Sequence, residues 1–431
     1  MLFRSNPLFA LVDVNNFYVS CERLFQPKLA NVPMVVLSNN DGCAVARSAE
    51  VKELGVKMGT PWFMMKNLAK THGIQALSSN YALYGDMSHR VVSVLRDFTP
   101  HLEVYSIDES FLRIESVSHL YGGSYPMGVQ VKERMKDWLG LPVCVGIGPT
   151  KTLAKFANHL AKKNGFLGGV CDISSLSQTE LYQWMGDVDV SEIWGVGRNI
   201  AKKLHHLGIF TVLDLAQVSP QSIRLQFGVV MERICYELRG VSCLKLEEVD
   251  PPRQQIIASR SFGRPVTTLE ELAESVATHV ARAAEKLREQ ESVTGGLQVG
   301  IQTNRHQFNE PQYAQSIWLP LPNATDNTLI LTELAIQGLR QIYKKGYRYK
   351  KAGVLLGLIS DKSIQQQSLF EDIDSRGQSA SLMKTLDRLN QRFGSGTVRA
   401  ARTGTHQRWQ MRSENRSKRY TTSWAELPVA S

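Results

Sequence analysis

The chain has 431 residues, 43% of them hydrophobic and 21% charged, a composition that excludes a disordered protein and indicates roughly two to four domains. No apolar run approaches the ~20 residues of a membrane span, and six cysteines without a CxxC pair argue against a disulfide framework or zinc site, so we expect a cytoplasmic protein with no membrane partner. The net charge of +10 favours a polyanionic partner, nucleic acid first.

The first 165 residues alternate apolar strands with amphipathic helices. The predicted elements are strands at 9–14, 102–107, 110–115 and 142–147, and helices at 81–98 and 126–140, the second of which starts with Pro and ends on Gly140. In chain order they run strand, helix, strand, strand, helix, strand, the split βαβ arrangement of ferredoxin-like folds. The sequence therefore predicts an α+β fold with a ferredoxin-like core.

A long insert, roughly residues 17–80, separates the first strand from the first helix. It contains a predicted strand at 33–38, a glycine-containing loop at 38–48 and a helix at 49–55. An ordinary connection between elements is much shorter, so we expect a small subdomain with a function of its own.

The character of the sequence changes after the core. Residues 171–240 have the pattern of short helices, and the polar, proline-containing segment 241–255 is typical of an exposed linker. Residues 256–360 alternate strands with two helical runs, which predicts a second α+β domain. The tail, residues 361–431, is polar and basic.

Three carboxylates are expected at one edge of the core sheet. Asp13 ends the first strand, and Asp108 and Glu109 occupy the turn between the next two strands. The split βαβ topology places these two points on the same edge. A solvated turn would explain the adjacent pair alone, but three close carboxylates repel one another unless a cation or a proton intervenes.

The types of residue available predict which cation this is. Oxygen ligands without Cys or His favour Mg²⁺, or Mn²⁺ as a substitute, and leave room for water and substrate phosphate. Two such ions suit phosphoryl transfer. In that scheme Asp13 and Asp108 bridge both ions, the backbone carbonyl of Val14 is a further ligand, and Glu109 holds the ion nearer the attacking hydroxyl.

Four segments, in this order and spacing, resemble the Y-family translesion DNA polymerases, and in particular their UmuC-like branch: DVNNFYVSCE, NNDGCAVARSAEVKELGVKMGTPW, YSIDESF and GIGPTKTLAKFANHLAKKNG. The resemblance covers nearly the whole chain. It implies a palm (1–16 and 81–170), inserted fingers (17–80), a helical thumb (171–240), a linker (241–255), a little finger (256–360) and the basic tail (361–431). It further implies an error-prone polymerase that copies damaged templates in the SOS response, acting on primed template DNA and dNTPs.

The resemblance also assigns roles to single residues. Asp13, Asp108 and Glu109 become the catalytic carboxylates, and Tyr18, after Phe17, becomes the steric gate that rejects a 2′-hydroxyl by shape. From the residues alone, Phe17 and Tyr18 read as core packing. Nucleotide contacts are expected from the following side chains: Phe17, Tyr18, Arg47, Lys52 and Lys155. The helix that carries Lys155 would otherwise be interpreted as a basic, solvated face.

A Gly-hydrophobic-Gly turn, from Gly195 to Gly197, lies between two predicted helices in the thumb region. In a helix-hairpin-helix the glycines let backbone N–H groups approach a phosphate at a helix N-terminus. Arg198, Lys202 and Lys203 add positive charge. We therefore expect this turn to contact duplex DNA without reading its sequence.

Partners are suggested by one short motif and by the resemblance. Gln366, Leu369 and Phe370 fit the bacterial sliding-clamp peptide, a short segment that offers one amide and two apolar anchors to a groove. The family implies a UmuD′-like dimer and a RecA filament. Two other functions remain open at this point: a cyclase-like palm enzyme, and a catalytically silent DNA-binding scaffold subunit.

Overall fold

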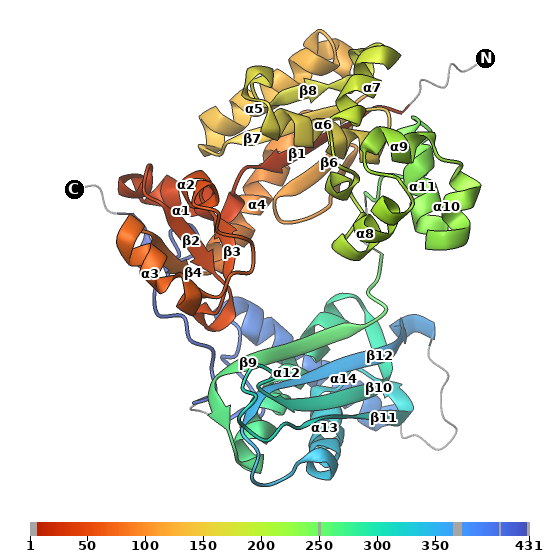
Figure 1. The fold of residues 1–431 in the computed structure, drawn as a ribbon. Coiled ribbons are helices and arrows are strands. Elements are labelled where there is room, and N and C mark those ends of the chain that lie inside the picture. The colour runs from red at the N-terminus through yellow and green to blue at the C-terminus, as the bar shows by residue number, and fades with distance from the viewer. Residues whose placement is uncertain (1–6, 249–250, 365–372, 405–406, 429–431) are drawn as a thin grey trace. The chain divides into compact units, whose positions relative to one another are not determined.

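The computed structural model describes residues 7–248, 251–364, 373–404 and 407–428 (Figure 1). The chain divides into two units. Unit 1 consists of residues 1–38, 43–250 and 415–431, and unit 2 of residues 39–42 and 251–414. No helix within the described ranges is long and apolar enough to cross a membrane.

Unit 1 is built on a five-stranded sheet with the order β5-β6-β1-β7-β8. Its strands are β1 (Phe9–Val14), β5 (Leu102–Val104), β6 (Glu109–Arg113), β7 (Val143–Gly148) and β8 (Val170–Asp172). β6 lies antiparallel to both β1 and β5, and β7 is antiparallel to β1. The first four strands thus have the ferredoxin-like order that the sequence predicts, and β8 adds a fifth, parallel to β7.

Helices cover both faces of this sheet (Figure 1). α4 (Tyr81–Arg96) and α5 (Ser124–Leu139) enclose the larger core on one face, and α6 (Lys151–Lys163) packs on the other. α5 begins at Ser124, so the expectation that it starts with Pro126 is wrong by two residues; it ends before Gly140, as predicted. Gly146 permits the approach of α6, because a Cβ there would lie 2.1 Å from the backbone nitrogen of Asn158.

The insert forms a three-stranded sheet, β3-β2-β4, with its own small core. Its elements are α1 (Phe17–Phe25), β2 (Met34–Leu37), β3 (Ala44–Arg47), α2 (Ala49–Glu53), α3 (Trp62–His72) and β4 (Gln75–Ser78). The expectation of a loop over the whole of 38–48 is wrong for β3. That strand is only half-buried and four residues long, too short to give a clear alternating pattern.

Five short helices follow the sheet, as the sequence predicts: α7 (Gln178–Gly186), α8 (Arg198–His206), α9 (Val212–Gln217), α10 (Pro220–Phe227) and α11 (Val229–Leu238). They share a core with the outer side of α6. The linker then leaves the helices, but its first half is anchored. Buried Glu237 accepts hydrogen bonds from the backbone of Cys243 and Leu244, and buried Glu103 accepts one from Glu247 at 2.6 Å.

Unit 2 contains an antiparallel sheet with the order β11-β10-β12-β9. Its strands are β9 (Ile256–Val266), β10 (Ser292–Thr303), β11 (Ala314–Thr325) and β12 (Tyr349–Asp361), and two helices, α12 (Leu269–Glu289) and α13 (Thr328–Ile342), cover one face. These elements match the second α+β domain expected from the sequence.

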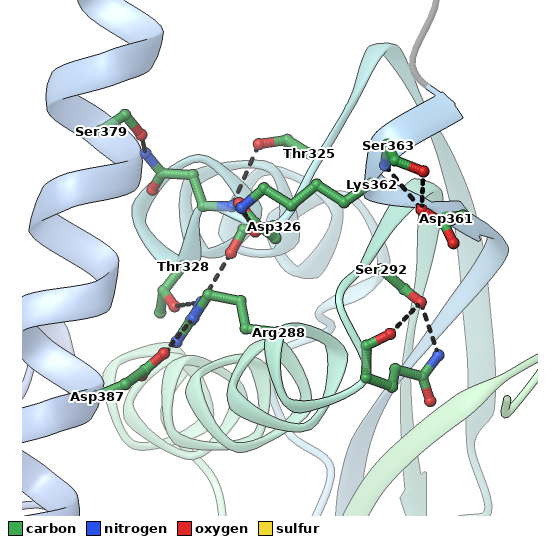
Figure 2. A network of polar contacts seen from close by, with 12 residues as sticks. Arg288, Ser292, Thr325, Asp326, Thr328, Asp361, Lys362, Ser363, Ser379 and Asp387 are labelled. Carbon is green, nitrogen blue, oxygen red and sulfur yellow. Dashed lines mark hydrogen bonds and ion pairs between the residues drawn. The ribbon is translucent and has the colours of Figure 1, made fainter.

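The tail adds structure that the sequence did not suggest. It forms a long helix, α14 (Ile373–Phe393), and further along contributes Trp409 to the core of unit 2, where the side chain is 4% exposed. Figure 2 shows how α14 is held: Arg288 of α12 forms a two-pronged ion pair with Asp387, at 2.6 and 2.7 Å, and also donates to the carbonyl of Asp326. Asp326 in turn pairs with Lys362.

Candidate active site

The three expected carboxylates lie at one edge of the unit 1 sheet. Asp13 in β1 stands directly opposite Glu109, the first residue of β6, and the backbone N–H of Val14 donates to the carbonyl of Asp108 at 2.9 Å. The topology argument therefore places these residues correctly. Asp13 is buried, at 8% exposure, whereas Asp108 and Glu109 are half-buried.

A serine fixes the turn that carries Asp108 and Glu109. The Ser106 hydroxyl donates to Oδ1 of Asp108 at 2.6 Å and accepts from the backbone N–H of Glu109 at 3.0 Å. The short side chain of Ser106 therefore fixes the Asp108 carboxylate and the backbone at Glu109 within the turn itself. A preorganised turn of this kind suits a site that must hold a cation.

Two lysines of α6 contact the carboxylates. Nζ of Lys162 lies 2.5 Å from Oδ2 of Asp13, and Nζ of Lys155 lies 2.7 Å from Oε1 of Glu109. Lys155 was expected from the sequence, although for a triphosphate rather than for Glu109. Lys162 was not, because lysines late in a basic helix ordinarily face solvent, and only the packing of α6 over β1 reveals its position.

Burial dominates the electrostatics of Asp13. It raises the pKa of this carboxyl to about 6, against the lowering effect of Lys162 and with a further rise from Glu109 and Asp108. The all-oxygen donor set at this edge fits Mg²⁺ or Mn²⁺ in its chemistry. Within the described residues, however, no group of three His, Cys, Asp or Glu side chains is arranged as a ready metal cage. Two of the three carboxylates are paired with lysines instead.

A cavity of about 230 Å³ adjoins the carboxylates and is lined by Asp13, Glu109, Lys155, Lys162 and Trp194, among others. Aromatic rings lie close to the ammonium group of Lys155: Nζ is 4.5 Å from the centre of the Tyr105 ring and 5.3 Å from that of Trp194. The indole N–H of Trp194 donates to the Tyr105 hydroxyl at 3.0 Å. Cation–π contacts restrain the ammonium group of Lys155 beside Glu109.

Tyr18 is the second residue of α1, which follows β1 and Asp13 after a short turn. Phe17 is buried in the core, but Tyr18 is only half-buried and stacks on Tyr84 with ring centres 4.3 Å apart and planes inclined by 15°. The chain turns into α1 through Asn16, which has a left-handed backbone (φ 50°). After that turn Phe17 fills the core, while Tyr18 packs against the edge of the core and stays partly exposed.

The predicted nucleotide ligands of the insert gather near the same edge. Lys52 donates to the side-chain oxygen of Asn16, and burial together with Arg47 and Lys162 lowers the pKa of its ammonium group. Nη1 of Arg47 donates to the carbonyl of Val56 at 2.6 Å. Three cations therefore lie close enough to influence one another beside the carboxylate edge, an arrangement that attracts a polyanion.

The Gly195–Gly197 turn differs from a full helix-hairpin-helix. Only a single 3₁₀ turn, Val190–Glu192, precedes it, so the expectation of a helix on both sides is wrong for the first one. Gly195 has φ 89°, and a Cβ there would lie 2.8 Å from Cδ1 of Ile234, so glycine is required. α8 starts at Arg198, and Arg198 and Lys202 are exposed.

A second basic surface was missed by the sequence reasoning. On unit 2, an open groove of about 430 Å³ runs over the sheet; it is lined by small and polar residues, including Ser259, Gly300 and Gly353, and by the cations Arg305 and Lys351. Glycines inside strands were the available signal, because they often mark a close approach of a ligand or another backbone. The clamp-like residues Gln366, Leu369 and Phe370 lie outside the described residues.

Comparison with known proteins covers almost the whole chain. The impB/mucB/samB family matches residues 12–159, its C-terminal domain matches 253–369, and a domain of unknown function matches 380–430. Protein ImpB of Salmonella typhimurium is 42% identical over 98% of this chain and 99% of its own length. Protein UmuC of Salmonella typhimurium is 43% identical over 97% and 99%. DNA polymerase IV of Desulfatibacillum aliphaticivorans is 29% identical over 90% and 95%.

Solved structures with the same fold include a Y-family DNA polymerase chimera of Dbh and Dpo4, with a TM-score of 0.64 and 20% identity, covering 82% of this chain and 99% of that one. The insertion ternary complex of Dbh DNA polymerase has a TM-score of 0.53 at 20% identity, with the same coverage. At these identities the likeness establishes the architecture: a palm, fingers and little finger of mixed helix and sheet.

Proposed function

The chain belongs to the impB/mucB/samB family, and from that premise we propose that it is a UmuC-like, Y-family DNA polymerase that performs error-prone translesion synthesis in the SOS response. Its enzyme class is DNA-directed DNA polymerase. One observation carries the proposal: Asp13 and Glu109 face each other at a sheet edge where the Asp108 carbonyl is tied to β1. We place the reaction in the cytoplasm.

The metal requirement follows from the donor set. Asp13 and Asp108, with the carbonyl of Val14, would hold two Mg²⁺ ions, and Glu109 the ion nearer the primer hydroxyl; Mn²⁺ is a possible substitute. When bound, such ions lower the pKa of an attacking hydroxyl and neutralise the leaving pyrophosphate. Ser106 contributes by fixing the Asp108 carboxylate and the backbone of Glu109 before the substrate arrives.

The chain's other residues bind and orient the nucleotide. Arg47, Lys52 and Lys155 supply positive charge for the triphosphate, and we add Lys162, whose ammonium group lies at Asp13. Tyr18, backed by Phe17, presents its ring beside the site and excludes a sugar with a 2′-hydroxyl. The position of Tyr18 at the end of the turn from β1 supports this role.

Template DNA is held through its phosphates. Backbone N–H groups at the start of α8, beside Gly195 and Gly197, together with exposed Arg198 and Lys202, form one such contact in unit 1. The groove over the unit 2 sheet is a second candidate surface, supported by Arg305 and Lys351 among small residues. Contacts of this kind are independent of sequence and sensitive to salt.

The family membership extends the proposal to partners. The segment Gln366–Phe370 would bind the sliding clamp, and a UmuD′-like dimer and a RecA filament would act as accessory factors.

Primer extension on undamaged and abasic templates, with and without clamp, UmuD′ and RecA, tests the function directly. Extension past the abasic site supports translesion polymerase activity, whereas complete inactivity under all these conditions favours a catalytically silent scaffold. Cyclisation of a nucleotide without primer extension would favour the cyclase-like alternative.

A further inference from the structure

The end of the tail is built into unit 1. Residues Asn415–Tyr420, here called the C-terminal strap, run beside β4, the edge strand of the small sheet. The backbone N–H of Ser78 donates to the carbonyl of Asn415 at 3.0 Å, and the N–H of Asn415 donates to the Ser78 hydroxyl at 3.0 Å. At its far end the ring of Tyr420 stacks on Phe25 of α1, with centres 5.0 Å apart.

A buried amide holds the middle of the strap. Asn80, 1% exposed, accepts from the backbone N–H of Leu83 and so caps α4. Its amide nitrogen lies 2.9 Å from the hydroxyl oxygen of Ser417 and 3.0 Å from the carbonyl of Lys418. The same side chain therefore fixes both the start of α4 and the position of Ser417.

Ser417 reaches a carboxylate that the reaction does not use. Its hydroxyl donates to Oε1 of Glu22 at 3.0 Å, and the Tyr84 hydroxyl donates to the same oxygen at 2.7 Å. Glu22 and Tyr84 are both fully buried. Both hydroxyls donate to Oε1, whereas Oε2 of Glu22 is buried without a hydrogen-bond partner in the described part of the chain. The buried carboxylate thus depends on these donors, and the two hydroxyls are coupled through one atom.

Tyr84 is also the ring on which Tyr18 stacks, at 4.3 Å. We propose that the C-terminal strap is a positioning element for Tyr18: Ser417 fixes Glu22, Glu22 fixes Tyr84, and Tyr84 sets the plane of the Tyr18 ring and thereby the discrimination between deoxyribose and ribose. The proposal rests on the role given to Tyr18 under the proposed function. Ser417 is then a specificity-determining residue 395 positions away from Glu22 in the chain.

The physical reason is that steric exclusion depends on small displacements. A ring that rejects a hydroxyl by contact must be held within about 0.5 Å of its working position. Removing the Ser417 hydroxyl leaves Oε1 of the buried Glu22 with the Tyr84 hydroxyl as its donor, and this loss favours a shift of the carboxylate toward other donors such as Gln26. Such a shift moves the Tyr84 hydroxyl that it accepts from, and with it the stack on Tyr18.

The test uses the full chain with Ser417→Ala, Tyr84→Phe and the conservative Ser417→Thr. We expect the ratio of kcat/KM for a deoxynucleotide to that for the matching ribonucleotide to fall about fivefold or more in Ser417→Ala and Tyr84→Phe, and to recover in Ser417→Thr. Ser413→Ala, at an exposed serine just before the strap, is the matched control and should leave the ratio unchanged. In the double variant Ser417→Ala with Tyr84→Phe, the ratio should fall no further than in the more affected single variant, since both hydroxyls act through one oxygen of Glu22.

A second measurement separates failure of this proposal from failure of the proposed function. Fluorotyrosine placed at position 18 reports ring stacking through its ¹⁹F resonance, with or without catalysis. A shifted resonance in Ser417→Ala supports the claim that the strap positions the Tyr18 ring. If Tyr18→Ala leaves ribonucleotide rejection unchanged, that separate result overturns only the assignment of Tyr18 as the steric gate. An unchanged resonance and unchanged ratio, with nothing but a lower Tm, would show that the strap merely stabilises the fold. Should Ser417→Ala not fold, Tyr84→Phe decides by the same readouts.

Discussion

Asp13 stands directly opposite Glu109 in the pairing of β1 with β6, and each carboxylate is held by a lysine of one helix, α6. The pairing of these strands sets the two backbones opposite each other, and the helix supplies the opposing charge. A change at either strand end or in α6 therefore acts on the same small site.

Asp108→Asn should reduce primer extension by about a thousand-fold or more, because the amide replaces a charged oxygen ligand with a neutral one. Steady-state single-nucleotide insertion with Mg²⁺ measures the loss. Asp137→Asn, on the exposed face of α5, is the matched control and should retain activity. Insertion by Asp108→Asn at the unaltered rate would remove the assignment of the site.

Replacing Arg198 and Lys202 together with alanine should weaken binding to primed DNA and flatten its salt dependence. Each phosphate contact contributes about 0.9 to the slope of log K against log salt, so the slope should decrease by about two. Fluorescence anisotropy across a series of NaCl concentrations provides the measurement. The double change Lys28→Ala with Lys136→Ala removes equal charge at exposed positions elsewhere in unit 1. Equal slopes in the two double variants would contradict a phosphate contact at α8.

The stability of unit 2 should fall in acid because of His279. Burial, with Arg282 and Arg260 nearby, lowers the pKa of this imidazole from 6.5 to about 3. Below pH 6.5 the imidazole takes up a proton in the unfolded chain but not in the folded chain. The free energy of unfolding of unit 2 therefore decreases progressively from pH 6.5 down to pH 3. The loss is about 2 kcal/mol at pH 5.

Urea unfolding at pH 7.5 and pH 5 measures this effect. His279→Gln retains a polar group beside Ser275 without the titration, so its unfolding free energy should change less between the two pH values. His72→Gln, at an exposed position, should behave like the unaltered protein. A pH dependence that is the same in all three proteins would mean that His279 is protonated in the folded state.

Trp409→Ala should destabilise unit 2 by about 3–5 kcal/mol, because it removes a large buried side chain from the core. Trp424→Ala, at a side chain that is 91% exposed, should have little effect. Gly263→Ala should also disturb the packing of the tail at Trp409, since the added Cβ would lie 2.4 Å from the carbonyl oxygen of the next residue, Gln410. Thermal unfolding compares the variants, and similar Tm values for the two tryptophan changes would contradict the docking of the tail.

The sequence predicted the core of the site because strand order and turn position depend on local patterns. Asp13 and Asp108 could be brought together from topology alone, and the ferredoxin-like order was confirmed. The contact of Lys162 with Asp13 depends on which face of α6 packs on the sheet, which a uniformly basic helix does not reveal. Trp409 is an isolated aromatic residue in a basic segment, so neither periodicity nor composition indicated that it is buried.

The division of the chain has a consequence for its integrity after cleavage. A cut within residues 251–255 would give an N-terminal piece that keeps 39–42, which belong to unit 2, and a C-terminal piece that keeps 415–431, which belong to unit 1. The N-terminal piece thus retains a segment that belongs to unit 2, and the C-terminal piece retains a segment that belongs to unit 1. A protein nicked at this linker should run as two bands under denaturing conditions and yet migrate as one species in its native form.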